Sequence, residues 1–203
     1  LGVTTINLNA REQALGFYQR LGYHGDKISH LLFDEIKHIA MQKQLIQSPQ
    51  VLSTEVINLV ETWHKTIPLS KAMGVNITSY NQKTLVATCD LLFNKNLHNT
   101  MFAGSIYTLA TLTGWGWVAL KLKEKSLTGD IVLAEAQVKY ISPIEGIAFA
   151  LTDDGNSEPD FSRLSEQRNE KISLTVNVFS GEIVAARFIA SYVVKPKKEN
   201  KEC

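Results

Sequence analysis

The residues best suited to chemistry in this sequence form a small polar group ahead of a long uncharged segment. Asn96, His98 and Thr100 come directly before Met101–Leu120, which contains no Asp, Glu, Lys, Arg or His. Hydrolysis normally needs a base that makes water nucleophilic. His98 is the only near-neutral base close to the segment. Polar donors without an acid favour chemistry that stabilises a negative oxygen over chemistry that activates water.

A helix over Met101–Leu120 would be roughly 30 Å long, enough to cross a bilayer. However, no second span accompanies it, and strand-like segments surround it. A helix that is apolar nearly all round can also be the centre of a soluble protein. We therefore expect a buried central helix and no membrane span. The residues that dilute the apolar run are Thr100, Ser105, Thr108, Thr111, Thr113, Gly114 and Gly116.

Composition excludes several classes of protein. The chain has 203 residues, 44% apolar and 20% charged, as in an ordinary globular protein. Its net charge of +1 gives no reason to expect nucleic acid as a partner, and residues 196–203 are expected to be a solvated polar tail. Cys89 and Cys203 have no metal-ligand spacing. We expect no metal, no bound cofactor and a cytoplasmic location.

Residues 1–46 indicate a strand, a helix and two further strands, too little to bury a core alone. Asn9 is predicted to cap the helix, and Gly22 to end it. The pattern from Ala14 through Phe17 and Tyr18 to Gly22 resembles the C-terminal end of GNAT-family N-acetyltransferases. In that family the residue at Tyr18 often serves as general acid, although Tyr18 could equally be a packing residue.

The GNAT resemblance has a clear limit. The family binds the coenzyme A pyrophosphate with a glycine-rich loop at a helix N-terminus, and no such loop precedes Asn9. This fragment alone is therefore not expected to acetylate anything. The chain begins within a strand-like segment, which suggests a piece of a longer protein. Residues 47–53 are expected to be a linker.

Residues 54–195 indicate a second domain of α+β class. An amphipathic helix with Val56, Leu59, Val60 and Trp63 on one face ends near Pro68. Two strands follow, with a turn at residues 81–83. After the central helix come four strands. Residues 132–139 alternate with period two, which places Val132, Ala134, Ala136 and Val138 on one face. Residues 153–170 are polar and are expected to be a long hairpin loop. An antiparallel sheet wrapped round one helix is the hot-dog fold.

This second domain resembles the hot-dog thioesterase superfamily, in particular the domain that follows a GNAT domain in bacterial proteins of the YiiD C-terminal type. The resemblance is carried by Glu61–Val75, Asn96–Trp117 and Ala134–Ile144. It implies an enzyme acting on an acyl thioester of coenzyme A or acyl carrier protein, and a homodimer formed through the sheet. Some members are malonyl-acyl carrier protein decarboxylases that supply fatty acid synthesis.

The family pattern is an asparagine, a loop, "HGG" at the start of the central helix, and an acid about two turns later. It places Asn96 at the asparagine, Phe102-Ala103-Gly104 at "HGG" and Thr111 at the acid. The histidine and the acid are thus replaced. The Ala103 and Gly104 amides could hold a thioester oxygen, because a helix start has unpaired N–H groups. Asn96 could add a donor or merely cap a turn.

Without the acid, two reactions remain open. Malonyl thioesters lose CO₂ without a base if the enolate is stabilised in a dry pocket. Thr100 or Thr111 could orient the malonyl carboxylate. Hydrolysis would need His98, or Glu135 from a neighbouring strand. A third possibility is a non-catalytic dimerisation or acyl-binding module. The remaining residues predicted to contact substrate are Phe102, Ser105, Tyr107 and Trp115.

Overall fold

The computed structural model describes residues 5–20, 23–33, 35–44, 52–153 and 159–197. The chain divides into an N-terminal unit, Leu1–Val51, and a C-terminal unit, Leu52–Cys203. Most of the expected linker, the helix-ending Gly22 and most of the polar tail lie outside the described residues.

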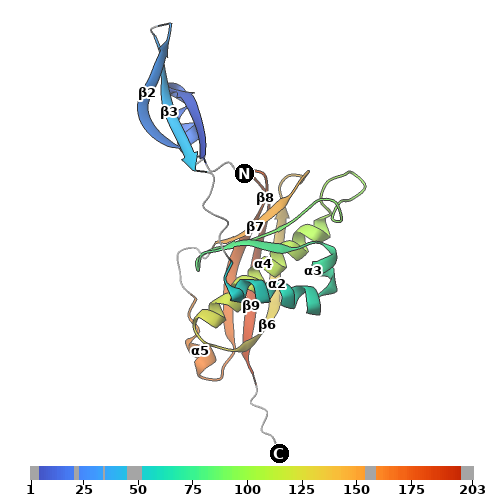
Figure 1. Cartoon of the computed structure of the whole chain (residues 1–203). Coiled ribbons are helices and arrows are strands. Elements are labelled where there is room, and N and C mark those ends of the chain that lie inside the picture. The colour runs from blue at the N-terminus through green and yellow to red at the C-terminus, as the bar shows by residue number, and fades with distance from the viewer. Residues whose placement is uncertain (1–4, 21–22, 34, 45–51, 154–158, 198–203) are drawn as a thin grey trace, which may run out of the picture. The chain divides into compact units, whose positions relative to one another are not determined.

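The N-terminal unit is a three-stranded antiparallel sheet with strand order β1-β3-β2 (Figure 1). Its core is small, because among the described residues only Ala10, Ile39 and Met41 are buried, with Tyr18 and Tyr23 packed at the margin. Its elements are β1 (Thr5–Arg11), a 3₁₀ turn (Glu12–Ala14), α1 (Leu15–Arg20), β2 (His24–Leu32) and β3 (Ile36–Gln44).

The prediction that Asn9 caps a helix is wrong. Asn9 lies within β1 and pairs with Ala40 of β3, and the helical turn begins only after Arg11. The ladder with β3 extends the strand over the whole of Thr5–Arg11, so pairing between strands overrides the local capping preference of asparagine.

The C-terminal unit has a six-stranded antiparallel sheet with order β4-β5-β7-β8-β9-β6 and a long helix, α4, along it (Figure 1). This confirms the predicted α+β hot-dog fold. Its elements are α2 (Thr54–Thr66), α3 (Pro68–Ala72), β4 (Asn76–Tyr80), β5 (Leu85–Cys89), α4 (Ala103–Glu124), β6 (Gly129–Tyr140), β7 (Ala148–Asp153), α5 (Ser162–Ser165), β8 (Glu170–Ser180) and β9 (Ile183–Pro196).

Helix α4 is about 33 Å long by its 22 residues and packs against β5, β6, β7, β8, β9 and α2. Leu109, Ala110 and Val118 are fully buried. In the described part of the chain no helix is both long enough and apolar enough to span a membrane. The uncharged segment is therefore the core helix around which the sheet curves.

Glycines let neighbouring elements approach α4 closely. A β-carbon at Gly114 would lie 2.5 Å from the Tyr192 hydroxyl, and one at Gly116 would lie 2.5 Å from Cζ2 of Trp63. Trp63 belongs to the buried face of α2, together with Val56 and Leu59, as the helical spacing predicted. The glycines thus set how closely α2 and β9 pack on α4.

A β-bulge changes the predicted faces of β6. The register with β9 shifts between Leu133 and Glu135. Before the bulge Leu133 turns inward while Val132 is 44% exposed, and after it Ala136 and Val138 are the half-buried residues. The single alternating face is therefore wrong for Val132 and Ala134, because the inserted residue reverses the pattern.

The connection between β7 and β8 is not wholly polar loop. Among its described residues, Ser162–Ser165 form α5, and Phe161 and Leu164 are buried in the main core. Asp160 accepts a hydrogen bond from the Ser162 amide at 2.9 Å, which starts the turn. Burial of these two apolar residues holds the polar segment against the core.

Candidate functional site

The loop before α4 is held by a buried residue that the sequence did not single out. Nδ2 of Asn94 donates to the carbonyl oxygens of Met73 and Asp90, both at 2.8 Å. The Asn94 carbonyl accepts from the Phe102 amide at 2.7 Å. Asn94 thus ties α3, the loop and the helix start together. The polar group ahead of the uncharged segment and the family pattern both indicated Asn96, and no local signal marked Asn94.

Asn96 organises the turn that ends at Thr100. Its Oδ1 accepts from the His98 amide at 2.8 Å and from the Thr100 amide at 3.3 Å. Its Nδ2 donates to the Thr100 hydroxyl at 3.0 Å. A carboxamide has two N–H donors. Among the described residues one of them is accepted by the Thr100 hydroxyl, so the other is available to a ligand. Turn capping and ligand binding are therefore compatible.

The first turn of α4 has no side-chain cap. Phe102 occupies the N-cap position without a capping hydrogen bond, and its side chain is 56% exposed. The Phe102 ring lies directly beside Gly104, where any β-carbon would collide with it. Ala103 is exposed and Gly104 and Ser105 are half-buried, so the free N–H groups of this turn are open to a ligand.

A half-buried stripe continues from this turn down α4. Gly104, Tyr107, Thr111 and Trp115 are three or four residues apart, so they share one side of the helix. Trp115 Nε1 donates to the Ile131 carbonyl of β6 at 3.1 Å, so the stripe runs along the β6 side of the molecule. The stripe spans about 17 Å from Gly104 to Trp115 at the helical rise per residue.

The side chain of Thr111 has a buried hydroxyl group. Its Oγ1 is buried and has no partner among the described residues. Its carbonyl oxygen accepts from the Tyr192 hydroxyl at 2.9 Å. Buried hydroxyls are nearly always paired, so the Thr111 hydroxyl is available to a partner outside the described residues. Thr111 lies about 10 Å along the helix from Gly104, too far for one malonyl group to reach both.

Tyr107 and Tyr140 lie near the start of the stripe, and Tyr192 contacts it farther along the helix, at Thr111. Tyr107 packs its ring edge-on against Phe188, with centroids 5.2 Å apart. The Tyr140 hydroxyl donates to the Ala103 carbonyl at 3.1 Å. Burial, and then the neighbouring Tyr107, raises the pKa of both Tyr140 and Tyr192. The phenols of Tyr140 and Tyr192 therefore stay protonated at physiological pH and can donate hydrogen bonds.

Helix α4 has no carboxylate before its last residue, Glu124. Glu135 is exposed on β6, and Glu124 is at the opposite end of α4. There Glu124 accepts from Tyr80 and pairs with the buried Lys121 at 3.2 Å. In the described ranges no group of His, Cys, Asp and Glu could hold a metal ion. The site is therefore apolar and rich in neutral donors.

The structure gathers part of the predicted site. Asn96 begins and Thr100 ends the turn that leads into the α4 start, which contributes Phe102, Ala103, Gly104 and Ser105. His98 is exposed, with its backbone amide, not its ring, bonded to Asn96. Trp115 is at the far end of the stripe, with its Nε1 bonded to Ile131, so it does not reach the helix start.

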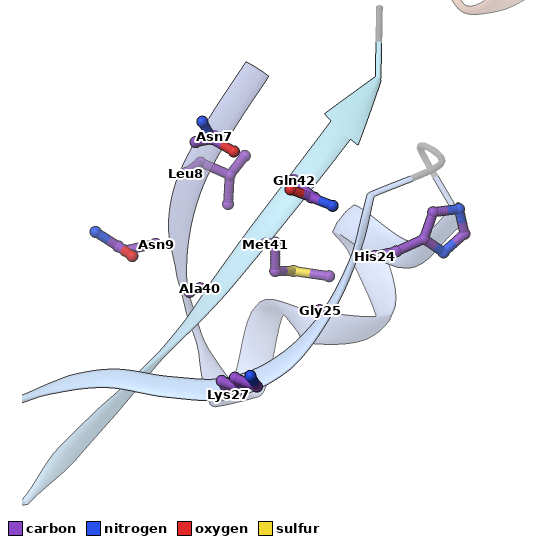
Figure 2. Close-up of a pocket in the computed structure, with 9 residues that line it drawn as sticks. All are labelled: Asn7, Leu8, Asn9, His24, Gly25, Lys27, Ala40, Met41 and Gln42. Carbon is purple, nitrogen blue, oxygen red and sulfur yellow. The ribbon is translucent and has the colours of Figure 1, made fainter. Parts of the chain in front are cut away.

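The N-terminal unit contains an open hollow of about 560 Å³ (Figure 2). Among the lining residues that the structure describes are a histidine and a lysine but no carboxylate, cysteine, serine or tyrosine. Tyr18, which the acetyltransferase resemblance marked as a possible acid, packs edge-on against Tyr23 with centroids 5.7 Å apart. The lining residues are Asn7, Leu8, Asn9, His24, Gly25, Lys27, Ala40, Met41 and Gln42.

Known proteins match the C-terminal unit. A solved structure of a protein from Shewanella oneidensis, described as a putative thioesterase, is 37% identical, with a TM-score of 0.68 over 71% of this chain and 100% of its own. A protein of unknown function from Chlorobaculum tepidum is 26% identical, with a TM-score of 0.62 over 70% of this chain and 94% of its own.

A thioesterase from Haemophilus influenzae shares the fold at 12% identity, with a TM-score of 0.58 over 77% of this chain and 99% of its own. A family model described as "Putative thioesterase (yiiD_Cterm)" matches residues 56–196, well over half of the sequence. With its hot-dog fold and its donor-lined helix start, the chain belongs to this thioesterase-like family.

Proposed function

We propose that the C-terminal unit acts on an acyl thioester at the start of α4, and that it decarboxylates a malonyl thioester to the acetyl thioester. The observation that carries this proposal is the combination of an uncapped helix start with an acid-free, half-buried stripe. The substrate would be a thioester of coenzyme A or of acyl carrier protein.

The carbonyl oxygen of the thioester would accept from the Ala103 and Gly104 amides. Neither residue has a side chain that would obstruct a close approach, and the dipole of a 22-residue helix favours negative charge at this end. An aligned donor of this kind contributes about 3 kcal/mol to the stability of an oxyanion in the transition state. The free N–H of Asn96 would supply a further donor.

Decarboxylation follows from this binding mode without a base. The bond between the carboxylate carbon and the methylene carbon breaks, and its electron pair moves into the enolate held by the amides. CO₂ leaves, the methylene carbon takes a proton from solvent, and the carbon–sulfur bond stays intact. The Thr100 hydroxyl, already bonded to Asn96, would orient the leaving carboxylate. Phe102 and Tyr107 would keep that carboxylate poorly solvated.

Thioester hydrolysis is the second candidate, and the family description favours it. Water would attack the same carbonyl carbon, and the thiol would leave. The base would have to be His98 or Glu135, both of which are exposed in the single chain. The same helix start serves either reaction, so the two differ in which bond breaks.

We further propose a homodimer that pairs through β6. This strand bonds β9 on one side, and on its other side no described strand pairs with it. A long unpaired edge is a template for another strand. Because the α4 stripe runs beside β6, such a dimer would cover the stripe, including the unpaired hydroxyl of Thr111.

The two reactions are separated by their products. The full chain is incubated with malonyl and acetyl thioesters of coenzyme A and of acyl carrier protein, and CO₂, free thiol and retained thioester are measured. Release of CO₂ with the thioester retained supports the proposal. Free thiol from either substrate establishes hydrolysis instead. No turnover of any thioester would leave the unit as a binding or dimerisation module.

A further inference from the structure

We infer that Tyr140 is a positioning residue for the Gly104 amide, which it orients and polarises through the Ala103 carbonyl. The inference rests on the proposed function, because it assigns Tyr140 to the same helix start. Tyr140 is the last residue of β6, and neither its strand nor its spacing marks it as part of a site.

The geometry lies within one peptide unit. Tyr140 Oη donates to the Ala103 carbonyl oxygen at 3.1 Å. That carbonyl and the Gly104 N–H belong to the same planar amide, so fixing the direction of one fixes the direction of the other. The Tyr140 hydroxyl therefore sets the direction of the Gly104 N–H, which would donate to the thioester oxygen.

The same bond strengthens the donor. A hydrogen bond accepted by an amide oxygen draws electrons from the nitrogen and makes its N–H more acidic, the cooperative effect seen in chains of hydrogen bonds. An enolate oxygen carries more charge than the carbonyl it replaces, so the stronger donor favours the transition state over the bound substrate. Loss of the hydroxyl should therefore lower kcat more than it raises KM.

Tyr140 is suited to this task because it stays protonated and its backbone is anchored independently. Burial raises the pKa of Tyr140, with the nearby Tyr107 adding to it, so the phenol remains a donor throughout the physiological range. The next two amides, of Ile141 and Ser142, donate to the Ala185 carbonyl at 2.8 Å and 3.1 Å. The side chain is 47% exposed, so Tyr140→Phe should leave the fold intact.

The direct test reads this peptide in the protein without substrate. Ala–Gly occurs once in the sequence, at residues 103–104. Labelling alanine with carbon-13 at the carbonyl and glycine with nitrogen-15 therefore gives one correlated NMR signal. We expect Tyr140→Phe to move the Gly104 amide proton and the Ala103 carbonyl carbon to lower frequency. If this variant does not fold, 3-fluorotyrosine at position 140 should shift both signals the opposite way.

Tyr192→Phe is the matched control. This variant also loses a hydrogen bond from a tyrosine hydroxyl to a carbonyl of α4, in this case the Thr111 carbonyl oxygen at 2.9 Å. It does not alter the contacts of the Ala103–Gly104 peptide. Turnover is then measured on the thioester that the wild-type chain processes. We expect Tyr140→Phe to lower kcat about threefold to tenfold, which corresponds to the loss of one neutral hydrogen bond, and to leave KM within twofold of the wild-type value.

The outcomes separate the two proposals. A shifted signal with a lower kcat supports the inference. An unchanged signal with normal kcat overturns it and leaves the proposed function standing. A shifted signal with normal kcat shows that the peptide is polarised but holds no oxyanion, which overturns both the inference and the proposed place of the carbonyl. An inactive wild-type chain overturns the proposed function, and the role of Tyr140 with it.

Discussion

Asn96 and Thr100 are joined by two kinds of contact across one turn. Nδ2 of Asn96 donates to the Thr100 hydroxyl at 3.0 Å, while its Oδ1 accepts from the Thr100 amide at 3.3 Å. Oδ1 holds the turn by accepting from backbone amides, whereas Nδ2 donates to the Thr100 hydroxyl, which also lies 3.4 Å from Oδ1. Substitutions can therefore separate the structural role of Asn96 from its proposed chemical role.

Asn96→Asp should keep the turn and abolish the proposed reaction. An aspartate oxygen can still accept from the His98 and Thr100 amides, but the N–H donor is lost and a negative charge is added. That charge opposes both the malonyl carboxylate and the enolate. We expect malonyl turnover to fall about 100-fold or more, as on loss of an oxyanion donor. Turnover and thermal unfolding are the measurements.

Asn96→Ala is the companion variant, because it removes the turn contacts as well. It should lower both stability and turnover. Turnover by Asn96→Asp within a few fold of the wild-type rate would remove Asn96 from the chemistry and leave it as a turn residue.

Gly116→Ala should destabilise the C-terminal unit although alanine favours helices. The new β-carbon would lie 2.5 Å from Trp63 Cζ2 and 3.2 Å from Leu85 Cδ2, and both residues are fully buried. Overpacking of this kind costs about 1–3 kcal/mol in the free energy of unfolding, more than the helix propensity returns. Urea unfolding measures the difference.

Gly146→Ala provides the comparison for Gly116, since a β-carbon there meets no heavy atom within 4 Å. Its free energy of unfolding should change little. Equal stability of Gly116→Ala and the wild type would mean that α2 and α4 do not pack as closely as described.

Glu124→Gln should destabilise the far end of α4. Lys121 is only 4% exposed, pairs with Glu124 at 3.2 Å and lies over the Trp117 ring. Removing the partner leaves a buried cation, which typically costs about 3 kcal/mol. Denaturant unfolding should show this loss, and Lys121→Met in the same chain should restore most of it.

The exposed pair of Glu166 and Arg168 serves as the control for Glu124. Both side chains are more than half exposed, so Glu166→Gln should change the free energy of unfolding by less than about 1 kcal/mol. A similar loss in Glu124→Gln and Glu166→Gln would show that Lys121 is better solvated than its burial indicates.

Dimerisation through β6 should appear in hydrogen exchange. The backbone amides of Gly129–Tyr140 that do not face β9 should exchange slowly at high protein concentration and faster on dilution, because the partner strand protects them. The opposite edge strand, Asn76–Tyr80, is the internal control and should not respond. Exchange of β6 that does not depend on concentration, in a chain that sediments as a monomer, would contradict this pairing.

The local sequence determined the central elements of this fold. The uncharged run required a helix buried on nearly every side, and the spacing of Val56, Leu59 and Trp63 identified the face of α2. Asn81 marked a turn and does bind the Lys83 and Thr84 amides. Each of these signals is local, because helical periodicity and turn chemistry act within a few residues.

Tertiary structure decided the rest. The bulge at Leu133–Glu135 depends on the register with β9, which no local pattern encodes, and pairing with β3 kept Asn9 in a strand. The contacts of Asn94 with Met73, and of Tyr140 with Ala103, join residues 21 and 37 positions apart. The sequence determined which groups were available and that no acid was among them. Folding alone decided which of these groups meet at the helix start, because long-range contacts form only when the chain closes.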